Sequence, residues 1–287
     1  MTPTHLPSRI GLIAGAGRFP FHVAQEAKRL GRAVIAVGIQ GWADPALAAQ
    51  VDAYEELPVG QLGRLIAFLK GHGVGEAIMA GKVTKEVLLG DRAGFDAEAQ
   101  ALLRRVSDFS AVDLLGAIGQ RLASEGITLL DSSSLLKANL CPVGVLTARA
   151  PSAAEEADIR VGLHAARVLA ALDIGQTVVV KARVIVAVEA LEGTDAAIRR
   201  AHTLAGGGVV VVKTAAANQD RRFDLPVIGT ETVDTLRSSQ ASCLAVEAGV
   251  TLLLDRESLI TSANAAGLCL IGVRPQAQKT PTFRFGV

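Results

Sequence analysis

The stretch Ile10-Gly-Leu-Ile-Ala-Gly-Ala-Gly-Arg-Phe-Pro20 decides the fold of the first half of the chain. A short apolar run leads into two glycines one residue apart, and an amphipathic segment follows over residues 19–30. This order is typical of a strand, a tight loop and a helix in a parallel sheet. Pro20 fits the first turn of the helix, because the amide hydrogen that proline lacks is not needed there.

The same alternation continues along the first half. Apolar runs at residues 33–37, 76–80 and 127–130 predict further strands, with helical patterns over 60–70 and 96–124 among them. Alternating strands and helices favour βαβ units. We therefore predict an α/β fold with a Rossmann-like parallel sheet in an N-terminal domain of residues 1–140.

A second α/β domain follows. Residues 141–151 contain two prolines and a glycine, and we place the linker between the domains there. Residues 152–287 are predicted to form a distinct C-terminal catalytic domain with a tail. Strands are expected at 177–181, 184–189, 209–213 and 251–254, the first two as a hairpin or one bent ribbon, and helices at 153–172, 195–204, 231–239 and 257–265.

Composition excludes several classes of protein. Half of the 287 residues are hydrophobic, which excludes general disorder. Lys and Arg total 29 against 28 Asp and Glu, so the chain lacks the basic excess of a nucleic-acid-binding protein. Three widely spaced cysteines argue against a disulfide scaffold or a structural zinc site and favour the cytoplasm. The most apolar stretch, residues 177–191, is interrupted by charges and shorter than the roughly 20 apolar residues of a membrane span.

The glycine loop Gly15-Ala16-Gly17 is the first candidate for ligand binding. Backbone amides between a strand and a helix N-terminus can face a phosphate. Pro20 stands where the dinucleotide fingerprint has its third glycine, and Val37-Gly-Ile-Gln-Gly41 offers no acidic ribose ligand. A nicotinamide or flavin cofactor is therefore not expected. Phosphate or nucleotide contact is favoured, and a tight turn without a ligand is the alternative.

Charged residues follow two predicted strands of the second domain. Glu189 ends one strand, and Glu192, Thr194 and Asp195 come just before a helix. Helix capping explains one of these residues but not the others. Lys213 ends another strand. Because ligands bind at the carboxyl ends of strands in open α/β sheets, we expect a shared site of carboxylates and cations.

The loop at residues 218–224, Asn-Gln-Asp-Arg-Arg-Phe-Asp, adds two acids, two arginines and two amides. Carboxylates without His or Cys partners suit Mg²⁺ or Mn²⁺. Arginines beside them suit a phosphoryl group, whose oxygens they can bind bidentately. A solvated network of salt bridges is the alternative interpretation of the same residues.

Four motifs of the chain resemble one known family. They are residues 11–20, Ala80-Gly-Lys-Val83, Val188-Glu-Ala-Leu-Glu-Gly-Thr-Asp195 and residues 219–229, and the resemblance extends from about residue 10 to 273. The family is the UDP-2,3-diacylglucosamine pyrophosphatases of lipid A biosynthesis, in the form found in α-proteobacteria. It is unrelated to the metallophosphoesterase with the same activity.

The resemblance implies Mg²⁺-dependent hydrolysis of UDP-2,3-diacylglucosamine to UMP and 2,3-diacylglucosamine 1-phosphate (lipid X). It also implies a cytoplasmic protein that works peripherally at the inner face of the inner membrane. A homo-oligomer is compatible with it, and nucleic acid is not an expected partner. Two alternatives stay open at this point: a nucleotide-sugar oxidoreductase, and a non-catalytic protein that binds an acylated sugar.

Residue chemistry and resemblance together predict the site residues. The expected catalytic residues are Asp224, Lys213 and Arg222. The expected substrate contacts are Gly15, Ala16, Gly17, Lys82, Gly193, Thr194, Gln219 and Arg221. The expected metal ligands are Asp224, Glu189, Glu192 and Asp195. Asp224 comes just before Leu225-Pro226, and the residue directly before a proline is restricted to extended conformations, which helps to fix the loop.

Overall fold

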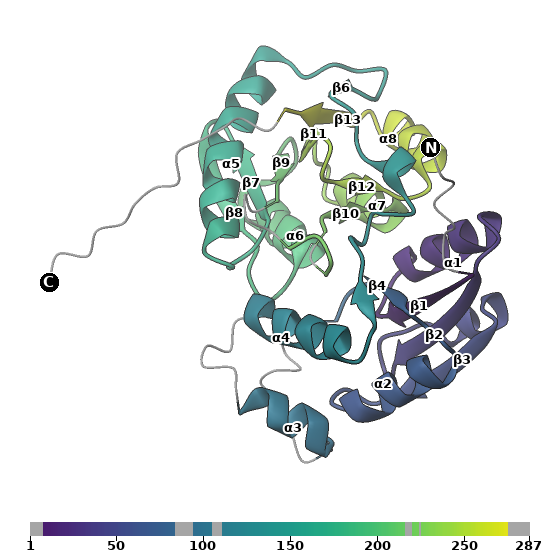
Figure 1. Ribbon diagram of the computed structural model, residues 1–287. Helices are drawn as coiled ribbons and strands as arrows, with labels where there is room; N and C mark the ends of the chain where they lie inside the picture. The colour runs from purple at the N-terminus through teal and green to yellow at the C-terminus, as the bar shows by residue number, and fades with distance from the viewer. Residues whose placement is uncertain (1–7, 84–93, 105–110, 216–219, 224, 275–287) are drawn as a thin grey trace, which may run out of the picture. The chain divides into compact units, whose positions relative to one another are not determined.

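A computed structural model describes residues 8–83, 94–104, 111–215, 220–223 and 225–274 of the chain (Figure 1). The chain divides into two compact units. Unit 1 consists of Met1–Ala138 and Asp220–Leu225, and unit 2 of Asn139–Gln219 and Pro226–Val287. Each unit therefore contains two separate parts of the sequence.

Unit 1 is built on a five-stranded sheet in the order β3-β2-β1-β4-β5. Every pair of neighbouring strands is parallel, which confirms the predicted Rossmann-like sheet. The order reverses between β1 and β4, which makes this pair the topological switch point of the sheet. The strands are β1 (Arg9–Ala14), β2 (Ala33–Ile39), β3 (Ala53–Leu57), β4 (Glu76–Ala80) and β5 (Thr128–Leu129).

Helices cover both faces of this sheet, as Figure 1 shows. On one face, apolar side chains of α2 (Leu62–Gly71), α3 (Ala97–Leu103) and α4 (Ala111–Ser124) form a core with β1 and β2. On the other face, α1 (Phe19–Arg29) packs on β1 and β2. The single helix predicted over residues 96–124 is thus two helices, and residues 105–110 lie outside the described part.

Strand β3 was not predicted. It lies at the edge of the sheet, and its sequence Ala-Tyr-Glu-Glu-Leu has two acids and only one fully buried side chain, Leu57. An edge strand is half exposed, so its sequence need not show the apolar run of a buried strand. A search for apolar runs therefore overlooks it.

Unit 2 contains a six-stranded mixed sheet in the order β6-β13-β11-β9-β7-β8. Strands β9, β11 and β13 are parallel, and β7 lies antiparallel between β8 and β9. A second sheet joins β10 (Val227–Ile228) and β12 (Leu252–Leu253). The six strands are β6 (Gly144–Val145), β7 (Thr177–Lys181), β8 (Val184–Val188), β9 (Val210–Lys213), β11 (Cys243–Glu247) and β13 (Cys269–Val273).

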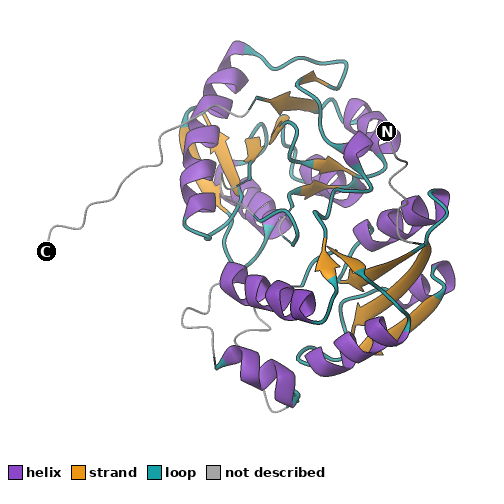
Figure 2. Ribbon diagram, viewed as in Figure 1, coloured by secondary structure: helices purple, strands orange, loops and turns teal. Residues whose placement is uncertain are grey.

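Four helices cover the six-stranded sheet; Figure 2 distinguishes them from the strands by colour. Helix α5 (Ala153–Ala171) packs on one face. The opposite face buries apolar side chains of α6 (Thr194–Ala205), α7 (Thr230–Ser238) and α8 (Arg256–Ala265). The predicted helices and the β7–β8 hairpin are confirmed. Strands β11 and β13, in the interior of the sheet, were not predicted.

The predicted linker at residues 141–151 is instead part of unit 2. Cys141 is buried, and β6 pairs with β13 in the main sheet. Gly144 therefore begins a short edge strand that Pro142 shortly precedes, and neither residue marks the division between the units. The chain first passes from unit 1 to unit 2 after Ala138.

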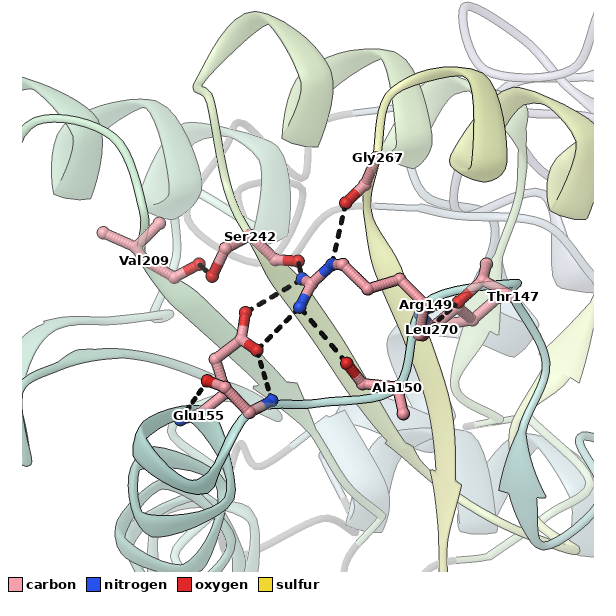
Figure 3. A network of polar contacts seen from close by, with 9 residues as sticks. Thr147, Arg149, Ala150, Glu155, Val209, Ser242, Gly267 and Leu270 are labelled. Carbon is pink, nitrogen blue, oxygen red and sulfur yellow. Dashed lines mark hydrogen bonds and ion pairs between the residues drawn. The ribbon is translucent and has the colours of Figure 1, made fainter.

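Arg149 ties the start of α5 to the strands beside it (Figure 3). Its guanidinium binds both carboxylate oxygens of Glu155 at 2.8 and 2.9 Å. It also donates to the carbonyls of Ser242 and Gly267, which precede β11 and β13. Burial would raise the pKa of Glu155, but Arg149 and the amide of Ser152 outweigh it and lower the pKa to about 2. Glu155 also completes a capping box with Ser152.

We expect Arg149→Met to lower the free energy of unfolding by about 2 kcal/mol, because Glu155 and two carbonyls lose their charged donor. The pKa of Glu155 is about 2 in the folded protein against an ordinary 4.5. Its stabilising contribution is therefore complete above the ordinary value and is lost as the pH falls toward 2. Urea unfolding at about pH 7 and about pH 3 measures both effects.

The matched control is Arg237→Met. Arg237 pairs with Asp234 on the surface, where both side chains are well exposed. Loss of such a pair costs less than about 1 kcal/mol. Equal unfolding energies for the two variants at neutral pH would contradict the role assigned to Arg149.

Candidate functional site

The loops after β1 and β4 meet at the switch point of unit 1. Gly15 donates its amide to Ala80 O at 2.8 Å, and Ala16 and Lys82 exchange two backbone hydrogen bonds at 2.8 and 3.0 Å. A Cβ atom on Gly15 would stand 2.7 Å from Lys82 O, and one on Gly81 would stand 2.7 Å from Ala16 O. The close approach of two backbones thus requires these two glycines.

This pairing limits what the glycine loop offers to a ligand. The amides of Gly15 and Ala16 already donate hydrogen bonds within the protein, so they are not free to bind a ligand. Contact of these two residues with substrate stays a prediction. Gly17 differs, because it is exposed and adopts a φ of +91°. Arg18 follows at the start of α1, with its guanidinium 5.1 Å from the centre of the Phe21 ring.

Lys82 and Arg18 supply cations at this edge of the sheet. Both side chains are exposed, and they follow β4 and β1 respectively. Lys82 was among the predicted substrate contacts. Arg18 was not, although it directly follows the glycine loop in the sequence. A cation at the switch point is suited to an anionic ligand.

The two arginines of the 220–223 segment also lie in unit 1. Arg221 Nε is 3.1 Å from Asp131 Oδ2. Arg222 binds both carboxylate oxygens of Asp220, and this hydrogen bonding lowers the pKa of Asp220 below its ordinary value. Both guanidinium groups are partly exposed. The predicted residues Asp224 and Gln219 lie outside the described part of the chain.

A cluster of polar groups lies at one edge of the unit 2 sheet. Strands β8 and β9 are both antiparallel to β7, so their carboxyl ends are on the same side. Lys213 Nζ donates to Thr194 Oγ1 at 2.7 Å, and Thr194 Oγ1 donates to Glu189 Oε1 at 2.8 Å. The structure therefore brings together three predicted residues that come from two strands and a helix.

Burial gives this cluster its electrostatic character. Lys213 is only 8% exposed. Burial would raise the pKa of Glu189, but the charge of Lys213 and hydrogen bonds from Thr177 and Thr194 outweigh it, and the pKa lies below its ordinary value. Glu189 is therefore ionised beside an ammonium group that is largely removed from water.

The other predicted acids have separate environments. Glu192 binds Arg200 at 2.5 Å and the amide of Ala190 at 3.1 Å. Asp195 lies in the first turn of α6, and its Oδ1 is buried without a partner among the described residues. Gly193, the N-cap residue of α6, has a φ of +82°, a conformation that favours glycine. Within the described ranges, no three His, Cys, Asp or Glu side chains form a metal-binding group. Because Asp224 lies outside these ranges, the predicted metal set stays a prediction.

Glu247 is a buried acid that the sequence analysis did not single out. It ends β11, is 7% exposed, and accepts the amide of Ala215 at 3.1 Å. Arg167 of α5 lies 3.4 Å from its other oxygen. Glu247 thereby holds the backbone just beyond Lys213. The sequence feature that could have indicated Glu247 is an acid at the end of a short apolar run, residues 243–247. That run was not predicted to be a strand.

The fold and these charged edges define a two-domain α/β protein with a Rossmann-like N-terminal domain. The chain belongs to the LpxI family: residues 9–139 match the LpxI N-terminal domain and residues 142–271 match the LpxI C-terminal domain. It is 30% identical over 279 residues to the UDP-2,3-diacylglucosamine pyrophosphatase LpxI of Caulobacter vibrioides, covering 93% of this chain and 98% of the relative. The family predicted from the four motifs is confirmed.

No helix in the described ranges combines the length and apolar character needed to cross a bilayer.

We expect Gly15→Ala to lower the free energy of unfolding by about 1–3 kcal/mol, because the new Cβ would collide with the Lys82 carbonyl. Gly75→Ala is the control, since a Cβ there meets no atom within 4 Å. Thermal unfolding of both variants measures the difference. If Gly15→Ala is as stable as Gly75→Ala, the two loops do not pack as described.

Proposed function

We propose that the chain hydrolyses the pyrophosphate of UDP-2,3-diacylglucosamine to UMP and lipid X. The observation that carries the proposal is the match to the Caulobacter relative along almost the full length of both chains. The buried cluster at Lys213 supports it, because pyrophosphate chemistry needs fixed positive charge beside the phosphate oxygens.

The residues of the chain divide this work between them. Lys213, held by Thr194, neutralises charge on a phosphate oxygen. Arg221 and Arg222 bind phosphate oxygens, because a guanidinium can do so bidentately. Asp224 orients the attacking water, a role that requires a carboxylate within hydrogen-bond reach of that water.

Mg²⁺ is the proposed cofactor, with Mn²⁺ as the substitute. Carboxylate oxygens are the preferred ligands of such an ion, and Asp195 Oδ1 is a buried oxygen without a described partner. Glu189 and Asp195 would supply ligands from unit 2, and Glu192, now bound to Arg200, would join by giving up that ion pair. When bound, the ion would supply additional positive charge for the phosphate oxygens.

Peripheral work at the inner face of the inner membrane is part of the proposal, because the substrate carries two acyl chains. The oxidoreductase alternative is less well supported. The loops at the switch point are bonded to each other, and Pro20 replaces the third glycine of the dinucleotide fingerprint.

The test is incubation of the purified protein with UDP-2,3-diacylglucosamine and Mg²⁺, followed by measurement of UMP. We expect UMP and lipid X, and loss of both when a chelator removes the metal. Binding of the acylated sugar without UMP release would instead support a non-catalytic binding protein. Specific binding of a dinucleotide, without UMP release, would support the oxidoreductase.

We expect Asp224→Ala to reduce turnover by about 10²-fold or more with an unchanged melting temperature, the usual scale for a positioned catalytic group. Asp234→Ala, which removes an exposed acid paired with Arg237, is the control. Turnover and melting are measured on one preparation of each variant. If the Asp224→Ala protein is destabilised but keeps nearly full turnover, Asp224 has a structural role and not a catalytic one.

We expect Lys213→Met to reduce turnover by about 10²-fold, because a desolvated charge beside the substrate phosphate is lost. The substitution also removes the main group that lowers the pKa of Glu189, so this pKa should rise. The acid limb of the pH–rate profile should then shift to higher pH if Glu189 must be ionised.

Lys181→Met is the matched control. Lys181 ends the neighbouring strand β7, and its ammonium donates to the carbonyls of Ala205 and Gly207 at 2.7 and 2.8 Å. Its loss should lower stability and leave turnover per folded molecule unchanged. Equal losses of turnover in the two lysine variants would contradict the proposed role of Lys213 at the substrate phosphate.

A further inference from the structure

A short piece of the second family domain forms part of unit 1. Asp220–Leu225 lies within the range matched by the LpxI C-terminal domain, yet it is compact with Met1–Ala138. What holds this piece there is the turn that follows β5, residues 131–133, called here the β5 turn.

Ser132 makes the main contacts. Its amide donates to Arg221 O at 2.8 Å, and its hydroxyl lies 2.7 Å from Arg222 O and 2.8 Å from Met79 O. Ser132 is 1% exposed. This buried hydroxyl therefore joins the end of β4 to a segment ninety residues away in the sequence.

The other two residues of the β5 turn hold the Arg221 side chain. Asp131 Oδ1 accepts both the amide and the hydroxyl of Ser133, at 2.7 and 2.6 Å, which fixes the turn. Ser133 Oγ then accepts Arg221 Nη2 at 3.0 Å, and Asp131 Oδ2 faces Arg221 Nε at 3.1 Å. Side chain and backbone of Arg221 are both held by the same turn.

Arg222 is held by different neighbours. Asp220 binds its guanidinium through two oxygens, with Nε–Oδ1 at 2.9 Å. A Cβ on Gly119 of α4 would stand 3.4 Å from Arg222 Nη1, which is an ordinary van der Waals distance, so the guanidinium lies beside this buried glycine. Both arginines nevertheless keep 38% of their side-chain surface exposed and retain donors for a ligand.

We propose that the β5 turn is a receptor for the 220–223 segment that positions Arg221 and Arg222 for the phosphate groups of the substrate. Asp131 and Ser132 are positioning residues in this arrangement. The proposal rests on the function proposed above. Lys82, which follows β4, lies at the same edge of the unit 1 sheet. The positive charges of the two arginines therefore add to that of Lys82.

The experiment compares three variants of the full chain. Ser132→Ala removes the hydroxyl that binds Arg222 O and Met79 O. Asp131→Asn keeps an oxygen for the turn but replaces the oxygen that faces Arg221 with an amide. Ser134→Ala is the matched control, because this neighbouring hydroxyl is buried and has no partner among the described residues.

Two readouts are measured. Limited trypsin digestion with mass spectrometry follows cleavage after Arg221 and Arg222, which reports how often the segment leaves its receptor. UMP release gives kcat and KM. One lost hydrogen bond should raise the cleavage rate about tenfold and lower kcat/KM about tenfold in Ser132→Ala and Asp131→Asn. Ser134→Ala should match the wild type in both.

If Ser132→Ala and Asp131→Asn are cleaved no faster than Ser134→Ala, the proposal that the β5 turn holds the 220–223 segment is wrong. Faster cleavage with unchanged kcat/KM would overturn the positioning role. If Ser132→Ala fails to fold, Asp131→Asn decides alone. A wild-type protein that releases no UMP would overturn the proposed function instead, and the trypsin readout, which needs no turnover, would still decide whether the segment is docked.

Discussion

The site in unit 2 depends on one constraint, the burial of the Lys213 ammonium. A charge that is only 8% exposed needs partners close by. Thr194 supplies an oxygen and Glu189 supplies the opposite charge. Both partners are within reach because β7 runs antiparallel between β8 and β9 and brings their carboxyl ends to one edge. The sheet order and the start of α6 at Thr194 are therefore what this buried charge requires.

Unit 1 shows that one sequence pattern can serve two kinds of chemistry. Two glycines between a strand and a helix commonly let a backbone approach a phosphate. In this chain Gly15 lets the backbone approach another backbone, that of Lys82, and Gly81 does the same from the opposite side. At the switch point these two backbones are hydrogen-bonded to each other. Cations on exposed side chains, and not backbone amides of Gly15 and Ala16, then provide the positive charge at this edge.

The predictability of each feature follows from how far apart its parts lie in the sequence. The parallel sheet and the β7–β8 hairpin were predicted because apolar runs and turns are local. Glu189 and Lys213 were found together because both end predicted strands. Glu247 was missed with its strand, since the run Cys-Leu-Ala-Val-Glu is too short to distinguish from part of a helix. The contact between Ser132 and Arg222 joins residues ninety apart, and no local pattern encodes it.

The discontinuous make-up of unit 1 has a consequence for biosynthesis. A ribosome delivers the five strands of the sheet long before Asp220–Leu225, so the Rossmann-like unit remains incomplete while most of unit 2 is translated. Until then the Ser132 hydroxyl lacks one of its two carbonyl partners. Unit 1 can therefore be completed only after residues 220–225 have been synthesised. A fragment that ends at the boundary between the two family domains would omit this last piece, however well its sheet is formed.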